Sequence, residues 1–234
     1  MLVIKKRSLI IILTLVSCII AFIICVNSLS LSALSDTAVN KTKIVLDAGH
    51  GGIDGGVTGI SSGAKESELN LILVKKLEKL LTSSGFNVVL TRSSDAGLYG
   101  IASGNLKRKD MLKRKEIINE AKPDLVVSIH LNKFSVSSRR GAQVFFREDS
   151  VESKRLATSI QSFFNSLEEA TRSFEALKGD YYILNCSPYP SVIAECGFLS
   201  NPEEEILLLS DSYQDKIVEA IFKGITSFLL QSTS

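Results

Sequence analysis

The two histidines of the 234-residue chain each follow an apolar stretch. His50 follows the run Ile44–Asp47 after two intervening residues, and His130 directly follows the run Leu125–Ile129. If both runs are parallel strands, their carboxyl ends meet at one edge of a sheet, which is where α/β proteins gather their chemistry. Because imidazole is a common ligand of zinc, this placement favours a metal centre over two unrelated histidines.

A zinc site built on these histidines needs a third ligand. Catalytic zinc commonly has three protein ligands and a water, and two His with one Glu is a known set. Glu66 lies in the first turn of the helix predicted after the glycine-rich segment 49–56, so it should overhang the same sheet edge as His50. Glu68 is the competing carboxylate, but two positions later it faces another side of the helix. A simple helix-dipole role for Glu66 stays open.

A further carboxylate, Glu195, ends the strand predicted at Val192–Glu195. Its apolar neighbours should desolvate it, which raises a carboxyl pKa toward the range useful for general acid–base catalysis. The alternative is a buried structural carboxylate with an ion partner. Two His, one Glu and a separate Glu base are the parts of a zinc hydrolase, in which the metal acidifies a water and polarises a carbonyl.

The elements that would position these residues alternate between strand and helix patterns from Lys43 onward. The expected strands are Ile44–Asp47, Asn87–Thr91, Leu125–Ile129, Ala142–Phe146, Tyr181–Asn185 and Val192–Glu195. The expected helices are Lys65–Leu81, Lys107–Ala121, Val151–Leu167, Tyr213–Leu230 and a short one at Pro202–Leu209, which Asn201 can cap. The pattern predicts one α/β domain over residues 42–232, a mostly parallel six-stranded sheet with helices on both faces.

Residues 1–35 form a different kind of segment. Leu9–Val26 is an uncharged, mostly apolar run of 18 residues preceded by Lys5-Lys6-Arg7. As a helix it would reach about 27 Å, close to the ~30 Å of a bilayer core, so residues 9–26 suit a retained membrane anchor. A small-residue pattern ending at Ser35 suits signal cleavage equally well. In either case the basic end should stay in the cytoplasm, and the rest of the chain should be exported across the cytoplasmic membrane.

Composition and charge limit the classes of partner that the chain can be expected to bind. The formal net charge is +2, and beyond the N-terminal segment no basic cluster is longer than short runs such as Lys107-Arg108-Lys109. Nucleic-acid binding requires a clustered basic surface, so nucleic acid is excluded as the expected partner. With 45% hydrophobic and 22% charged residues, the chain can bury a core. Outside the apolar segment only Cys186 and Cys196 remain, and both a disulfide and two buried thiols stay open.

A serine hydrolase is the first rival. The segment Gly59-Ile60-Ser61-Ser62-Gly63 matches the G-x-S-x-G nucleophile elbow. The elbow requires a strand immediately before it, whereas residues 53–58 have the composition of a glycine-rich loop. The sequence therefore disfavours nucleophilic catalysis by Ser61.

Four ordered blocks of the chain resemble the zinc-dependent N-acetylmuramoyl-L-alanine amidases of type 3, which cut bacterial peptidoglycan. The blocks, in chain order, are IVLDAGHGGIDGG, KESELNL, SIHLN and IAECGFLSNPEE. The resemblance runs from about Lys43 to Leu230. Carried over block by block, it implies His50, Glu66 and His130 as the zinc ligands and Glu195 as the catalytic acid–base.

Two arginine-bearing stretches also match patterns of this family. They are Thr91-Arg92 and the region around Arg114, and we expect a structural role for both. Within the family the chain most resembles the small germination-specific amidases of the spore cortex, which have no separate wall-binding domain.

The resemblance also implies a reaction and a location. The reaction would be hydrolysis of the amide between the lactyl group of N-acetylmuramic acid and the L-alanine of the stem peptide. The partners would be peptidoglycan glycan strands with their stem peptides, in the cell wall or spore cortex, and the need for an activating partner protein stays open. The competing hypothesis is a membrane-tethered, non-catalytic peptidoglycan-binding module, which would keep the fold but lack a ligand or the base.

Overall fold

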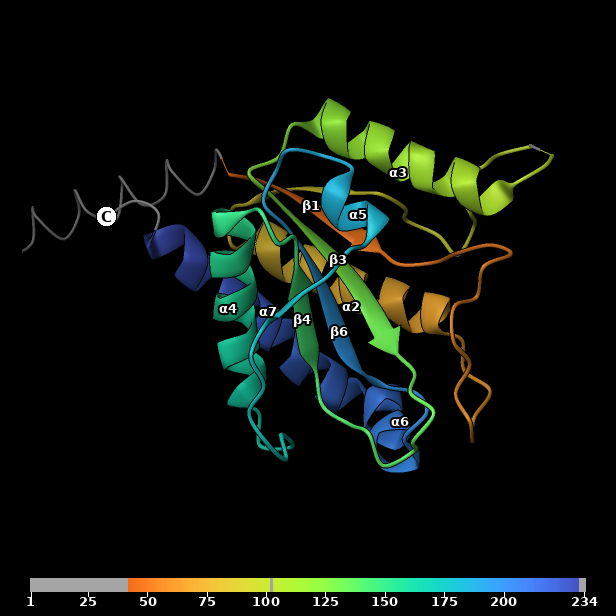
Figure 1. Ribbon diagram of the computed structural model, residues 1–234, viewed down its shortest axis with the longest axis vertical. Coiled ribbons are helices and arrows are strands. Elements are labelled where there is room, and N and C mark those ends of the chain that lie inside the picture. The colour runs from red at the N-terminus through yellow and green to blue at the C-terminus, as the bar shows by residue number, and fades with distance from the viewer. Residues whose placement is uncertain (1–41, 102, 232–234) are drawn as a thin grey trace, which may run out of the picture. The chain divides into compact units, whose positions relative to one another are not determined.

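The computed structural model describes residues 42–101 and 103–231 (Figure 1). Within these residues, six strands and six helices follow one another in the mixed order of an α/β domain. The predicted signal or anchor segment, residues 1–35, lies outside the described residues. Of the helices that are described, none is both long and apolar enough to cross a membrane.

The strands form one sheet, in the order β2-β1-β3-β6-β4-β5. They are β1 (Lys43–Ala48), β2 (Asn87–Leu90), β3 (Leu125–Asn132), β4 (Gln143–Phe146), β5 (Leu177–Lys178) and β6 (Ser191–Phe198). Strands β2, β1, β3 and β6 are parallel, whereas β4 is antiparallel to β6 and β5 is parallel to β4. The predicted mostly parallel, six-stranded sheet is confirmed.

Helices cover both faces of this sheet, as predicted. They are α2 (Glu66–Ser83), α3 (Leu106–Ala121), α4 (Val151–Asn165), α5 (Tyr182–Asn185), α6 (Pro202–Leu209) and α7 (Asp211–Gln231). Helix α7 contacts both α2 and α4, and these three pack on one face, while α3 and α5 pack together on the other (Figure 1). Helix α6 follows β6 and packs against β6 and α7.

The central strands are apolar throughout because both of their faces are covered. One face of the sheet packs in a cluster that joins Val45, Val126 and Ile193 to Ile118 of α3 and Ile183 of α5. Side chains alternate along a strand, so His130 of β3 projects from the same face as Val126. The core thus determines which side of the sheet carries the chemistry.

Two strands run further than predicted. Strand β3 continues two residues past His130 and β6 three residues past Glu195, so neither residue ends its strand. The extensions form because Leu131 and Phe198 are buried, at 3% and 4% exposure. His130 and Glu195 are register partners on these neighbouring parallel strands.

The prediction of a strand at Tyr181–Asn185 is wrong, because this segment contains the short helix α5. The backbone N–H groups of Leu184 and Asn185 both donate to the carbonyl of Tyr181, one turn back. A short apolar run does not distinguish a strand from a helix by its pattern alone. The sixth strand is instead the two-residue β5, Leu177–Lys178, at the edge of the sheet.

Helices α4 and α7 approach so closely at Gly224 that an alanine there should destabilise the fold. A Cβ on Gly224 would lie 2.5 Å from Cα of Ile160 and 2.9 Å from its backbone nitrogen. Gly to Ala in an open helix gains about 1 kcal/mol, but forcing two backbones apart costs about 1–3 kcal/mol. We expect Gly224→Ala to lower the free energy of unfolding, as measured with denaturant. The exposed neighbour Lys223→Ala is the control, and equal or higher stability of the Gly224 variant would contradict the packing described.

Candidate active site

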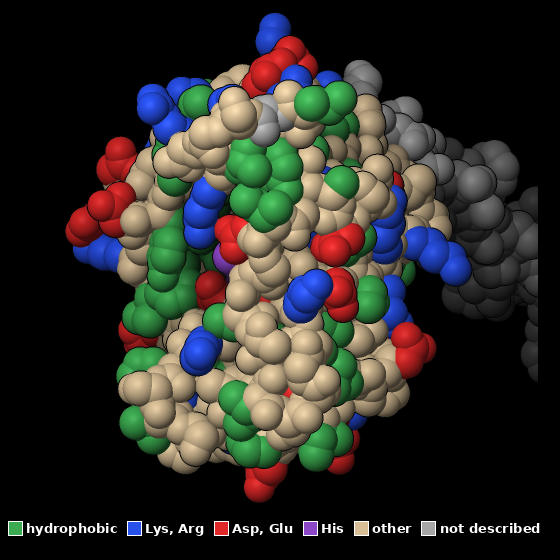
Figure 2. Space-filling model, turned by 90° about the vertical axis from the view of Figure 1, so that its right-hand side faces the viewer, with side chains coloured by type: hydrophobic (Ala, Val, Ile, Leu, Met, Phe, Trp, Pro, Cys, Tyr) green, Lys and Arg blue, Asp and Glu red, His purple; other side chains and the backbone are tan. Residues whose placement is uncertain are grey.

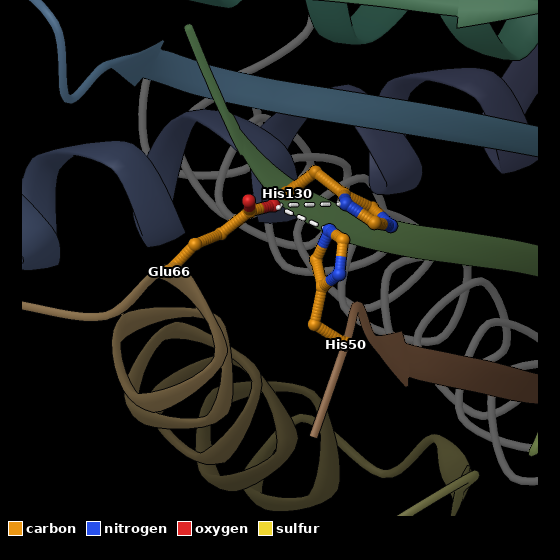
Figure 3. Close-up of side chains that lie close together, drawn as sticks. All are labelled: His50, Glu66 and His130. Carbon is orange, nitrogen blue, oxygen red and sulfur yellow. Dashed lines mark hydrogen bonds and ion pairs between the residues drawn. The ribbon is translucent and has the colours of Figure 1, made fainter. Parts of the chain in front are cut away.

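Three side chains with metal-ligand chemistry converge at the carboxyl ends of β1 and β3 (Figure 3). His50 lies just beyond β1, His130 lies in β3, and Glu66 is the first residue of α2. Oε1 of Glu66 is 3.2 Å from Nε2 of His50 and 3.0 Å from Nδ1 of His130. The structure therefore brings together the three residues whose spacing in the sequence suggested a metal centre.

The two separations from Oε1 of Glu66 suit one small metal ion, and the possible ligand atoms all lie within 4.8 Å of one another. Zinc binds nitrogen and oxygen ligands at about 2.0–2.1 Å, so two ligands of a tetrahedral site lie roughly 3.3 Å apart. The distances of 3.0 and 3.2 Å from Glu66 Oε1 are close to that separation. The donor set, two imidazoles and one carboxylate, is also one that zinc accepts in catalytic sites.

Glu66 is buried and its carboxylate is held on both oxygens. Oε2 accepts a hydrogen bond from the backbone N–H of Val57 at 2.8 Å, and Oε1 accepts one from Leu131 at 3.1 Å. Burial alone would raise the pKa of Glu66, but hydrogen bonds and charge from His130 and His50 outweigh it and hold that pKa well below its usual range. Glu66 is therefore ionised, as a metal ligand must be.

Glu68, the competing carboxylate, points elsewhere. Its side chain is 51% exposed and lies 3.7 Å from the ammonium group of Lys65. Two positions along a helix turn a side chain to a different face, which is the difference seen here between Glu66 and Glu68.

His50 is held in an uncommon backbone conformation by two buried arginines. Its φ is 62°, in the left-handed region, which costs a non-glycine residue about 1–3 kcal/mol. Arg114 donates to the carbonyls of Ala48 and His50, and Arg92 donates to those of Ala48 and Gly49 at 2.8 and 2.9 Å. These contacts correspond to the structural role expected of both arginines.

Asp47 anchors this arginine network from inside the sheet. Its buried carboxylate accepts hydrogen bonds from Arg114, from Ser128 and, at 2.6 Å, from Thr91. Burial would raise the pKa of Asp47, but the charge of Arg114 and the two hydroxyl groups lower it to about 2. Sequence reasoning missed this residue. The available signal was a lone acid in the apolar run Ile44–Asp47.

A second missed residue is Asp54, on the turn after His50. Its Oδ1 lies 3.0 Å from Nδ1 of His50, the ring nitrogen that does not face Glu66, and Lys107 approaches its other oxygen at 3.2 Å. The contact is a close approach of the two side chains and not a hydrogen bond, because Nδ1 of His50 has no hydrogen-bond partner among the described residues. The spacing of four residues from His50 was the only hint in the sequence.

The ring of His130 lies directly against the backbone at Gly49. A Cβ on this residue would lie 2.2 Å from Cε1 of His130 and 2.3 Å from its Nε2. Glycine is therefore required at position 49 for the imidazole to reach Glu66.

Glu195 lies beside the cluster without an ion partner. Its Oε2 is buried and has no hydrogen-bond partner among the described residues, and no Lys or Arg of the described ranges is among the charges that act on it. Burial raises the pKa of Glu195 to about 7; the positive charge of His130 opposes this rise and the charge of Glu66 adds to it. Within residues 42–101 and 103–231, the alternative of a paired structural carboxylate finds no partner for Glu195.

A pocket opens next to the histidines on the face of the sheet covered by α3 and α5. Its lining combines aromatic, apolar and charged side chains and includes Ile53, Tyr99, Lys107, Met111, Tyr181 and Tyr182. Figure 2 views the molecule from the right-hand side of Figure 1, toward which the arrow of β3 points, and histidine atoms show there only as a small area between larger side chains. The cluster is therefore reached from solvent through a lined recess.

Of the two alternatives left open for Cys186 and Cys196, a disulfide or two buried thiols, the structure shows two buried, free thiols, and burial raises the pKa of each. Ser61 lies in a turn, and the described segment before it contains isolated bridges only, not the strand that a nucleophile elbow needs.

Comparisons with known proteins agree on one family. Residues 44–227 match the family described as N-acetylmuramoyl-L-alanine amidase. The germination-specific N-acetylmuramoyl-L-alanine amidase of Bacillus subtilis (strain 168) is 34% identical over 192 residues, which are 80% of this chain and 80% of that protein. The CwlD amidase of Clostridioides difficile, solved in complex with the GerS lipoprotein, has a TM-score of 0.78 and 40% identity over 81% of this chain and 98% of that one. An N-acetylmuramoyl-L-alanine amidase of Clostridium difficile 630 has a TM-score of 0.72 and 32% identity over 81% and 97%.

The raised pKa of Glu195 predicts a pH-dependent stability difference in metal-free protein. A carboxyl that titrates near 7 when folded and near 4.5 when unfolded binds its proton more tightly in the native state. Its contribution to stability is therefore complete below about pH 4.5 and is lost as pH rises through 7, by roughly 3 kcal/mol. The Glu195→Gln variant has no carboxyl to ionise and therefore does not lose this stability. We expect its free energy of unfolding, relative to that of the wild type, to increase between pH 5 and pH 8. A difference that does not change with pH would contradict the burial of an unpaired carboxyl.

Proposed function

The chain belongs to the N-acetylmuramoyl-L-alanine amidase family of peptidoglycan hydrolases, and we propose that His50, Glu66 and His130 bind the zinc ion for its reaction. The bond cleaved joins the lactyl carbonyl of N-acetylmuramic acid to the amino group of L-alanine in the stem peptide. The observation that carries the proposal is the approach of one nitrogen from each histidine to Oε1 of Glu66, at 3.2 and 3.0 Å.

The protein's part in the metal chemistry is to hold a charged, oriented donor set. A bound zinc ion lowers the pKa of a water toward 7 and polarises a carbonyl. The low pKa of Glu66 keeps its carboxylate available to the cation near neutral pH. The backbone N–H of Val57 orients the Glu66 carboxylate, and the Asp54 carboxylate lies 3.0 Å from Nδ1 of His50.

Glu195 is the proposed proton carrier. Its Oε2 takes the proton of the attacking water while the water oxygen forms a bond to the lactyl carbon. Oε2 of Glu195 then gives this proton to the L-alanine nitrogen as the carbon–nitrogen bond breaks. A pKa of about 7 suits both steps, because the carboxyl exchanges its proton readily at neutral pH.

The relatives support a setting for this reaction. The Bacillus subtilis relative is germination-specific, and we propose action on the peptidoglycan of the spore cortex. The Clostridioides difficile relative was solved with a lipoprotein, which supports a partner protein for this chain as well. Export across the cytoplasmic membrane, with residues 9–26 as anchor or signal, would bring the enzyme to its substrate.

The competing hypothesis of a non-catalytic peptidoglycan-binding module requires a missing ligand or a missing base. Neither a candidate ligand nor a candidate base is missing among the described residues, since the three candidate ligands lie together and Glu195 is the register partner of His130. Release of stem peptide from purified peptidoglycan by the zinc-loaded protein separates the two hypotheses.

The proposed ligands should each be necessary for metal. We expect His50→Ala, Glu66→Ala and His130→Ala each to lose most of the bound zinc, because three protein ligands are the usual set of a catalytic site. Zinc content of the purified proteins measures this. Glu68→Ala is the matched control on the same helix and should stay loaded, and the reverse result for the two glutamates would refute the assignment of Glu66.

A change at Glu195 should affect the rate of hydrolysis without affecting metal binding. We expect Glu195→Gln to keep its zinc while stem-peptide release falls roughly 10²–10⁴-fold, the usual contribution of a general base. Zinc content and turnover are measured on one preparation. A zinc-loaded variant with wild-type turnover would rule out proton transfer by Glu195.

A further inference from the structure

We propose that Glu205, in helix α6, is a positioning residue for Glu66 and acts through the loop of residues 57–65. The inference rests on the zinc site proposed above and concerns how its carboxylate ligand is held. Glu205 itself belongs to neither the metal cluster nor the recess beside it.

The carboxylate of Glu205 is buried and holds the tip of this loop. The side chain is 1% exposed, and its oxygens accept hydrogen bonds from the backbone N–H of Ser61 at 3.0 Å, from that of Ser62 at 2.8 Å and from the Ser62 hydroxyl at 2.6 Å. Hydrogen bonds to an ionised acceptor are about twice as strong as neutral ones. The loop tip is thereby attached to a helix that is 144 residues away in sequence.

The base of the same loop holds Glu66. The backbone N–H of Val57 donates to Oε2 of Glu66, the oxygen that does not face the histidines, and the N–H of Glu66 donates back to the carbonyl of Val57, both at 2.8 Å. Thr58 and Lys65, the next residues inward along the loop, form an isolated antiparallel β-bridge. A shift of the loop would therefore move the donor that orients the Glu66 carboxylate.

Gly59 makes room for the attachment. A Cβ on this residue would lie 2.2 Å from Oε1 of Glu205 and 3.0 Å from Oγ of Ser62. The backbone of the loop thus lies directly against the carboxylate, and a single methyl group would separate them.

Burying the charge of Glu205 with no cationic partner among the described residues is costly. The loop's own amide and hydroxyl groups offset this cost, so loop position and carboxylate position depend on each other.

The decisive variant is Glu205→Gln in the full-length protein, with Glu203→Gln as control. Gln keeps the shape but loses the charge and one acceptor oxygen. Glu203 is on the same helix, 78% exposed, and pairs with Arg140 at the surface. We expect roughly 10-fold weaker zinc binding in Glu205→Gln, within the range for residues that orient a metal ligand, and faster amide exchange at Ser61 and Ser62. Glu203→Gln should match the wild type in both measurements, made by competition with a chelator and by hydrogen exchange.

The outcomes separate this inference from the proposed function. If the wild type takes up no zinc, the zinc site itself is wrong and the inference falls with it. If the wild type binds zinc and Glu205→Gln binds it equally well, only the positioning role is wrong. A variant with a lower melting temperature but unchanged zinc affinity also refutes the positioning role, because it shows a contribution to stability alone.

Gly59→Ala provides a second, independent variant. In the wild-type background it should weaken zinc binding, because the new methyl group displaces the Glu205 carboxylate. In a Glu205→Ala background the same change should add little, since the displaced group is already gone. Ser62→Ala, which removes only the hydroxyl donor, is a milder variant should Glu205→Gln fail to fold, and unchanged zinc affinity there and in Gly59→Ala would overturn the proposal. Additive effects of Gly59→Ala and Glu205→Ala would do so as well.

Discussion

The left-handed turn at His50 is the constraint on which the site depends. Turning there brings the imidazole toward Glu66, and the carbonyls of residues 48–50 around the turn accept hydrogen bonds from side chains. Buried carbonyls need donors, and here the guanidinium groups of Arg92 and Arg114 supply them. The buried charge of Arg114 in turn needs Asp47. The position of one ligand is therefore determined by residues from β1, the end of β2 and α3, not by the glycine-rich loop alone.

Two glutamates of one site are held in opposite electrostatic conditions. Glu66 is surrounded by imidazoles and N–H donors, which favour its ionised form and suit a cation ligand. Glu195 lies between His130 and Gln143 on the neighbouring strands, and its buried Oε2 has no hydrogen-bond partner among the described residues, so burial raises its pKa to about 7. Carboxyl groups in contrasting environments commonly divide acid–base work from charge stabilisation. Chemical identity alone would not assign these two roles, whereas burial and hydrogen bonding do.

The sequence allowed the sheet and the histidines to be predicted because strands buried on both faces leave unbroken apolar runs. Each such run in β1 and β3 points to the polar residue that follows it, which is how His50 and His130 were found. The same reasoning failed at Tyr181–Asn185, where five residues fit a strand and a helix equally well. Strand β5, with two residues, is defined by its pairing with β4 and has no local signal of its own.

The remaining features could not be predicted from the sequence because they are contacts between distant segments. Sequence reasoning expects a structural role for Arg114 but not its carbonyl partner, which lies 66 residues away. No local pattern indicates Glu205, whose partner in the loop lies 144 residues away. These contacts divide the site into two parts. His130 and Glu195 stand on paired strands in the middle of the sheet, where backbone hydrogen bonds fix their relative position. His50 and Glu66 stand on segments held largely by side chains from elsewhere. Loosening those side chains should therefore weaken metal binding while leaving the proton carrier in register.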